Sequence, residues 1–156
     1  VIGGYTFKST GYTMTGIPVL RIGNINTGTL TLNDLVYWTY TESLERYFIY
    51  PGDLVMSLTG TVGKDDYANV CVLPAFFDRY YLNQRNAKLN IFGDLSNMYL
   101  LYLLRNKEIK KKLTGISRGI RQANISNSDI LSLNVPIPPL SLQNQFAEFV
   151  EKVEAQ

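Results

Sequence analysis

Short apolar runs closed by turn residues fill most of the chain up to residue 92, and this pattern constrains the fold more than any other feature. The clearest runs are Val19–Ile22, Leu54–Leu58 and Tyr67–Leu73, each bordered by Gly, Pro or Asn. Ala87–Phe92 alternates apolar and polar residues, as a half-exposed strand does. The pattern predicts a sheet of short strands. A Thr39–Glu42 capping box predicts a helical turn or two ending at Tyr47.

The last third of the chain has helical periodicity instead. Ser96 or Asn97 caps a long helix that ends at Gly115, and Ser126 with Asp129 forms a capping box for a shorter one. A further helix begins at Ser141, after a Pro-Pro break. The fold class predicted is therefore mixed α/β (α+β), with a twisted, mostly antiparallel sheet flanked by helices and a C-terminal helix.

The final helix carries an apolar stripe with i, i+4, i+7 spacing, which is typical of the seam of a coiled coil or helix pair. Its members are Leu142, Phe146, Phe149, Val150 and Val153. An ordinary core helix is the alternative. We expect a partner or dimer helix to pack on this stripe.

Size and composition favour one globular domain of 156 residues, with 46% hydrophobic residues. No apolar run approaches the ~18 residues of a membrane span, so no membrane partner is expected. The lone cysteine, Cys71, lies in an apolar run and indicates a buried thiol in a reducing, cytoplasmic compartment. The chain begins at Val1 rather than Met, as a piece of a longer protein would.

The sequence contains no histidine. This removes the usual general base, the Ser-His triad and most zinc sites. Gly60–Lys64 has glycines, but their spacing does not fit a phosphate-binding Walker loop. We therefore expect no catalytic residue, no metal site and no cofactor in this chain.

Positive charge is concentrated between Arg105 and Arg121, where seven basic residues accompany a single acid, Glu108. The whole chain has a net charge of only +2, so the remainder is net acidic. A concentrated basic segment beside a glycine-rich loop suits a polyanion surface. A solvated helix face is the bland alternative.

Four polar loops carry the candidate DNA contacts, because amides, hydroxyls and cations suit phosphates and base edges. Arginine can grip guanine and glutamine can grip adenine, so Arg118, Arg121 and Gln122 are the expected base readers. Arg21 falls within a predicted strand and is interpreted as a core-edge ion pair. The candidate residues are Lys8, Ser9, Tyr12, Thr59, Thr61, Lys64, Asn83, Gln84, Arg85, Lys111, Lys112, Arg118, Arg121, Gln122 and Asn124.

Several segments, in this order and spacing, resemble the target-recognition domain of the specificity (S) subunit of type I restriction–modification systems. They are Phe7–Ser9, Gly16–Ile25, Pro51–Val55 with Thr59-Gly60, Leu82–Gln84, Tyr99–Leu104, Gln122–Ser126, and Val135–Leu140 followed by Gln143 or Gln145. Each segment alone is a weak signal. Their arrangement across nearly the whole chain makes the resemblance specific.

The resemblance implies sequence-specific binding to double-stranded DNA by a non-catalytic module. Residues 1–137 would be the recognition domain, and residues 138–156 the start of a spacer or dimerisation helix. A partner modification subunit would bind S-adenosylmethionine and methylate adenine, and a restriction subunit would cleave. Because such subunits hold two recognition domains, this chain would be a fragment or a half-length subunit that dimerises.

Two other interpretations stay open. The chain could be the recognition portion of a single-chain restriction–modification enzyme of type II. It could also be a protein-interaction module whose basic patch meets an acidic partner.

Overall fold

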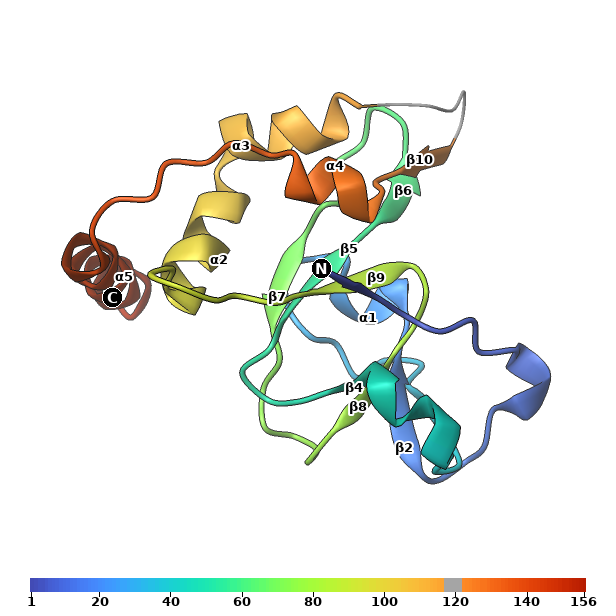
Figure 1. Cartoon of the computed structure of the whole chain (residues 1–156). Helices are drawn as coiled ribbons and strands as arrows, with labels where there is room; N and C mark the ends of the chain where they lie inside the picture. The colour runs from blue at the N-terminus through green and yellow to red at the C-terminus, as the bar shows by residue number, and fades with distance from the viewer. Residues whose placement is uncertain (117–121) are drawn as a thin grey trace.

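The computed structural model describes residues 1–116 and 122–156, which form three small sheets flanked by helices (Figure 1). One four-stranded sheet has the order β1-β9-β5-β7 and is antiparallel throughout. Its strands are β1 (Ile2–Gly3), β9 (Asn86–Leu89), β5 (Leu54–Ser57) and β7 (Val70–Val72).

A second four-stranded sheet has the order β3-β2-β8-β4. Its strands are β3 (Val36–Trp38), β2 (Ile17–Leu20), β8 (Tyr80–Leu82) and β4 (Phe48–Ile49). Only the β2–β8 pair is parallel. A two-stranded sheet joins β6 (Thr59–Thr61) to β10 (Gln122–Asn124). The mostly antiparallel α/β class predicted from the sequence is confirmed, with the strands divided among three sheets.

Side chains that alternate along a strand pack into two separate clusters of the hydrophobic core. Leu54 and Met56 of β5 pack in a cluster with helical residues such as Leu101, whereas Val55 between them packs in a cluster with Leu20 and Leu82 of the second sheet. Successive side chains of a strand point to opposite faces, so one strand serves both clusters. Burial of each such side chain contributes about 1.5–3 kcal/mol.

Helices cover the first sheet and the top of the molecule in Figure 1. They are α2 (Asn97–Arg105), α3 (Lys107–Thr114) and α4 (Asn127–Leu131), while α1 (Ile22–Ile25) and the 3-10 helices η1 (Ser9–Gly11) and η2 (Glu42–Tyr47) connect strands. Ser96 caps α2, and Ser126 with Asp129 forms the predicted capping box of α4.

The prediction of one long helix before Gly115 is wrong in one respect. Asn106 is extended, with φ −62° and ψ 129°, and it divides the segment into α2 and α3. Its side-chain oxygen accepts hydrogen bonds from the backbone N–H groups of Glu108 and Ile109. A side chain that satisfies the first N–H groups of a new helix favours a fresh start over continuation.

Three smaller expectations also need correction. The residue preceding η2 is Thr41, and no side chain caps it, so the predicted Thr39 capping box does not form. β9 is not half-exposed, because it lies between β1 and β5 and is largely buried. Arg21 does not lie within a strand, because it follows β2, which ends at Leu20, and is the N-cap residue of α1.

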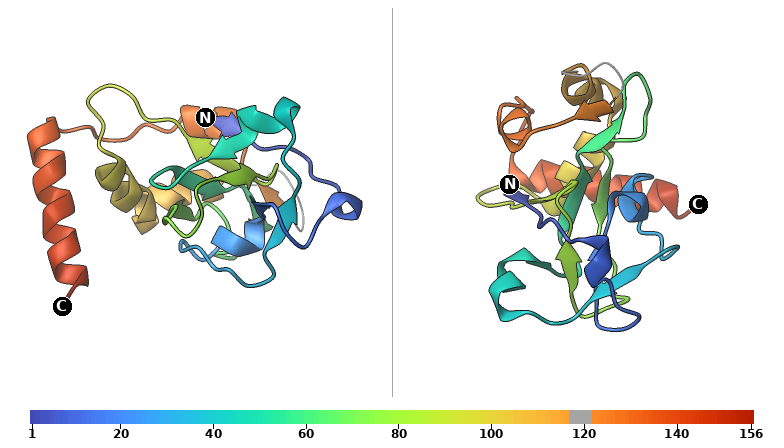
Figure 2. Two further views of the ribbon diagram at one scale, coloured as in Figure 1. Left: turned by 90° about the horizontal axis from the view of Figure 1, so that it is seen from below. Right: turned by 90° about the vertical axis from the view of Figure 1, so that its right-hand side faces the viewer.

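The C-terminal helix α5 (Leu140–Glu154) stands along one side of the molecule and contacts α2 (Figure 2). Gln143 and Ala147 are its buried residues. The Gln143 amide accepts a hydrogen bond from the Ser96 N–H at 2.8 Å and donates to the carbonyls of Asp94 and Pro138. None of the helices in the described ranges is long and apolar enough to cross a membrane.

Candidate nucleic-acid interface

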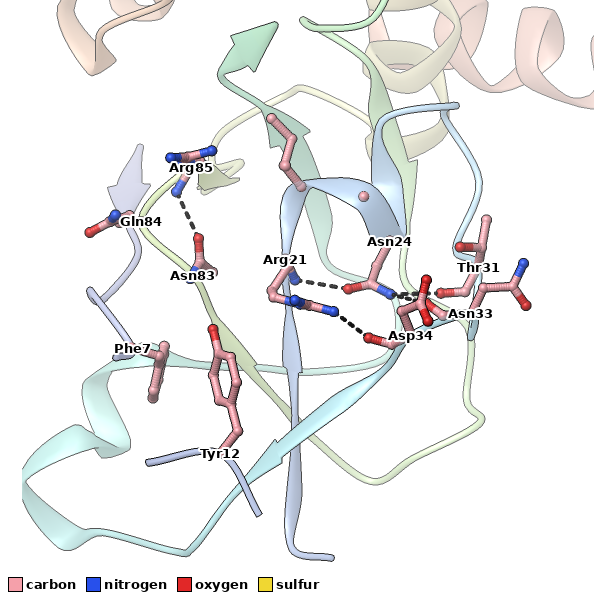
Figure 3. Close-up of a pocket in the computed structure, with 12 residues that line it drawn as sticks. Phe7, Tyr12, Arg21, Asn24, Thr31, Asn33, Asp34, Asn83, Gln84 and Arg85 are labelled. Carbon is pink, nitrogen blue, oxygen red and sulfur yellow. Dashed lines mark hydrogen bonds between the residues drawn. The ribbon is translucent and has the colours of Figure 1, made fainter. Parts of the chain in front are cut away.

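A hollow of about 540 Å³ opens where the N-terminal loop, the start of α1 and the β8–β9 turn meet (Figure 3). It brings Tyr12 together with Asn83, Gln84 and Arg85, four candidate residues from two predicted loops. Arg21, Asn24 and Asp34 form another part of the same lining. Polar side chains that are distant in the sequence thus converge on one cavity.

A second hollow of about 370 Å³ adjoins the first, because Ile22 and Arg85 line both. It holds Thr59, Thr61 and Gln122 as well as Arg85, so candidates from three separate segments meet there. Together the two hollows collect seven of the fifteen candidate residues on one continuous surface.

The β8–β9 turn positions three of these residues through local hydrogen bonds. The Asn83 side-chain oxygen accepts from the Arg85 N–H at 3.2 Å, and the Asn83 carbonyl accepts from the Asn86 N–H at 3.0 Å. Asn83 is buried, whereas Gln84 and Arg85 are exposed at the tip. Gln84 accepts a hydrogen bond from Thr6. The turn therefore presents the Arg85 guanidinium to solvent beside both hollows.

Pairing of β6 with β10 places Gln122 opposite Thr61 and Asn124 opposite Thr59. The sequence had placed Gln122 and Asn124 in a loop, and the structure shows them in a strand. Thr59 is buried and donates its hydroxyl to Asn124 at 3.0 Å, so these two candidates satisfy each other. Gln122 is exposed, and this position fits a contact with DNA better than that of Thr59.

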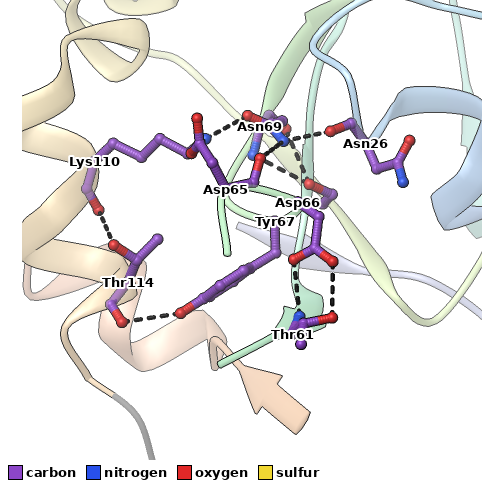
Figure 4. Close-up of polar contacts among 9 residues, drawn as sticks. Asn26, Thr61, Asp65, Asp66, Tyr67, Asn69, Lys110 and Thr114 are labelled. Carbon is purple, nitrogen blue, oxygen red and sulfur yellow. Dashed lines mark hydrogen bonds and ion pairs between the residues drawn. The ribbon is translucent and has the colours of Figure 1, made fainter. Parts of the chain in front are cut away.

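The segment after β6 is fixed by Asp66 (Figure 4). Its carboxylate accepts hydrogen bonds from the Thr61 N–H at 2.8 Å and the Thr61 hydroxyl at 2.9 Å. The Thr61 N–H is the main reason that the pKa of Asp66 lies below its usual range. A Cβ on Gly60 would stand 2.4 Å from the Asp66 side chain, so glycine permits this close approach.

Some basic residues of α2 and α3 bind other groups of the protein, and others are exposed to solvent. Lys110 pairs with Asp65 and donates to Asn69 at 2.6 Å, and its side chain is only 11% exposed (Figure 4). Arg105 donates to the Gly28 carbonyl at 3.0 Å. Lys111 pairs with Glu108 at 3.0 Å on the surface, where such a pair contributes little. Lys107 and Lys112 are exposed as well, so Lys107, Lys111 and Lys112 are the cations of α3 that a polyanion can reach.

The remaining candidates that the structure describes line neither hollow. Lys8 and Ser9 are exposed at η1, and Lys64 is exposed in the loop after β6. Arg118 and Arg121, the expected guanine readers, fall outside the described residues.

Arg21 is the residue of this surface that the sequence interpretation missed. It makes no ion pair with any described acid. Its guanidinium donates to the Asp34 carbonyl and lies over the Tyr12 ring, 5.8 Å from the ring centroid. The Gly23-Asn24 turn signal, which begins two residues after Arg21, indicates that the strand ends near Arg21.

Among the described residues, no cluster of three or more His, Cys, Asp or Glu side chains could hold a metal ion. Burial raises the pKa of the Cys71 thiol, as expected for an inert core cysteine.

The stripe predicted on the last helix is mostly exposed. Leu142, Phe146, Phe149 and Val153 are 44–65% exposed, and only Val150 is half-buried. Phe146 lies at the edge of the packed face, with its ring centroid 6.0 Å from that of Tyr99. The helix thus uses one face against its own domain and leaves a second, apolar face uncovered.

Comparisons with known proteins show which family and which proteins this chain is similar to. The family described as "Type I restriction modification DNA specificity domain" matches residues 1–156. The type I restriction enzyme EcoKI specificity subunit of Escherichia coli (strain K12) is 29% identical over 147 residues, which cover 90% of this chain and 30% of that protein. The MjaVIII specificity subunit of Methanocaldococcus jannaschii is 23% identical over 156 residues, covering 97% of this chain and 36% of that protein.

Solved structures share the fold. The HsdS subunit from Thermoanaerobacter tengcongensis has a TM-score of 0.67 at 19% identity, over 99% of this chain and 34% of that one. The type I restriction–modification system S subunit from M. genitalium has a TM-score of 0.58 at 15% identity, over 98% of this chain and 37% of that one. The chain spans about a third of the length of these relatives.

Proposed function

Because the chain belongs to the type I restriction modification DNA specificity domain family, we propose that it reads one half of a split target in double-stranded DNA. The observation that carries the proposal is the convergence of Tyr12, Arg85 and Gln122 on two adjoining hollows. Amides, hydroxyls and an unpaired arginine on one surface provide the donors and acceptors that duplex recognition uses.

The two parts of the chain have different roles in this proposal. Residues 1–137 form the recognition domain, and residues 138–156 begin a spacer helix. The exposed stripe of α5 then packs on a helix of a second recognition domain or of a second copy of this chain. An apolar helix face without a cover in its own domain supports this role, because apolar surface gains stability when a partner removes it from water.

In this proposal, methylation and cleavage of the DNA are carried out by partner subunits. We propose that a modification subunit carries S-adenosylmethionine and methylates the DNA, and that a restriction subunit cleaves it. The domain itself acts without a cofactor, and the site of action is the cytoplasm, where the DNA is. Asp66, the acid that lines the second hollow, accepts hydrogen bonds from Thr61 within the fold, which fits a structural role for this carboxylate.

Gln122→Ala tests the proposal at the level of bases. If Gln122 reads a base edge, the assembled methyltransferase complex loses preference at one position of the target, by about 1–3 kcal/mol. Fluorescence anisotropy with a panel of singly substituted duplexes measures this loss. Methylome sequencing of cells carrying the intact system supplies the wild-type motif and hence the panel.

Gln145→Ala, which removes an exposed glutamine from α5, is the matched control and should leave the motif unchanged. Equal weakening on every duplex would make Gln122 a phosphate contact. A wild-type complex without sequence preference and without a phosphate-like salt dependence would favour the protein-interaction module instead.

A further inference from the structure

Arg21 lines the larger hollow, and hydrogen bonds with Asn24 hold its backbone in place (Figure 3). Its backbone N–H donates to the Asn24 side-chain oxygen at 3.0 Å, and its carbonyl accepts from the Asn24 N–H at 3.0 Å. Asn24 is 2% exposed and also donates to the carbonyls of Thr31 and Asn33. This arrangement fixes the loop that carries Asp34, whose carbonyl accepts from the Arg21 guanidinium.

The contacts that hold Arg21 leave its charge without a counter-ion. Its neighbours are a carbonyl and an aromatic face, and no described acid forms an ion pair with it. A guanidinium has five N–H donors. One serves the Asp34 carbonyl, and the Nε is buried and has no hydrogen-bond partner within residues 1–116 and 122–156. The side chain therefore offers a ligand its charge and the other N–H groups at the tip of the guanidinium.

Arg85 is the second cation of this surface and lies where the two hollows meet. Its guanidinium has no ion pair with any described residue. Asp34 is the one acid in the larger hollow's lining as described, so two arginines leave this cavity net positive.

The shape of the site indicates whether it binds the base edges or the backbone phosphates of a DNA duplex. Base edges lie roughly 8.5 Å deep in the major groove and are reached by protruding side chains. Phosphates form the outer ridges of the duplex, and a ridge enters a hollow. We propose that Arg21 and Arg85 bind backbone phosphates of one DNA strand, which runs through the two adjoining hollows; this inference rests on the proposed function of duplex recognition.

Salt dependence of binding provides the test, because each phosphate contact contributes about 0.9 to the slope of log affinity against log salt. In the intact complex, Arg21→Gln and Arg85→Gln each lower the slope by about 0.9, and the double variant lowers it by about twice that. The affinity lost in each single variant is about threefold greater at ~50 mM than at ~200 mM salt. Affinity falls equally on target and non-target duplexes.

Arg21→Lys keeps the charge and should retain the wild-type slope, which separates loss of charge from loss of folding. Arg46→Gln is the matched control, since Arg46 also lies over a tyrosine ring, at 4.8 Å from the Tyr47 centroid, but lines neither hollow. Arg85→Gln alters an exposed turn side chain, so it tests the same surface without disturbing α1.

Wild-type slopes in both glutamine variants would overturn the inference and leave duplex recognition intact. A loss confined to one base-pair position would also overturn it, by making the arginine a base reader. Absence of salt-dependent duplex binding in the wild-type complex would instead refute the proposed function itself.

Discussion

Polar side chains of the interface fall into two groups according to what they already bind. Thr59, Thr61 and Lys110 are held by other protein groups, and their hydrogen bonds shape the loops. Arg85 and Gln122 are exposed. A side chain that keeps free donors at a rigid position can bind a ligand without first breaking a bond within the protein. Residue type alone does not separate these groups, since both contain cations and hydroxyl or amide side chains.

Asp66→Asn tests the residue that fixes the loop after β6. The folded-state pKa of Asp66 is lowered, so its stabilising effect is present above the unfolded pKa of about 3.9 and is lost as the pH falls through the folded value. We expect the variant to lose about 1 kcal/mol of unfolding free energy at pH 7, since the carboxylate is partly exposed.

Urea denaturation between pH 7 and about pH 3 measures this loss. The difference from wild type should shrink toward the acid end of the range. Asp78→Asn removes an exposed carboxylate elsewhere and is the control. A constant difference across the pH range would show that the Asp66 charge does not hold the loop.

Each element of the fold is ended by a local signal and placed by contacts that are distant in the sequence. Ser126 and Asp129 begin α4 through their reciprocal hydrogen bonds, as the sequence predicts. The β6–β10 pair, in contrast, joins residues 59–61 to residues 122–124, and only the fold brings them together. Loop closure over such a separation requires burial elsewhere to stabilise it.

Asn106→Ala tests the break between α2 and α3. Removing the side chain that accepts from Glu108 and Ile109 should cost about 1 kcal/mol of unfolding free energy. Thermal or urea unfolding followed by circular dichroism measures the loss. Asn106→Asp retains an accepting oxygen and should remain near wild type, whereas equal losses in both variants would contradict a capping role.

At the scale of the whole molecule, α5 packs one face on the domain and leaves another face exposed. Gln143 and Ala147 fasten one face of the helix to the domain, whereas Leu142, Phe149 and Val153 remain exposed on another. At 3.6 residues per turn these three residues, with Phe146, form a single stripe. No residue of α5 lines either hollow, so the hollows and the exposed stripe are separate features of the described chain.

Phe149→Asp tests this seam. Phe149 is 65% exposed, so the substitution should leave the domain folded but remove apolar surface that a partner helix would bury. Loss of one buried phenylalanine, about 1.5–3 kcal/mol, raises the dissociation constant at least about tenfold. Sedimentation velocity of residues 1–156 measures the self-association. Asn144→Asp adds the same charge about half a turn away and should not weaken it; equal effects would contradict a specific seam.

The sequence by itself determined the mixed α/β class, most helix starts and the stripe on the last helix. These features depend on turn residues, caps and periodicity, which act over a few neighbouring positions. Tertiary structure alone decided that Arg21 lies in a hollow, that Lys110 is bound by Asp65, and that Gln122 extends a strand opposite Thr61. Those outcomes depend on which distant segments pack together, and packing is set by burial of the whole chain rather than by any local pattern.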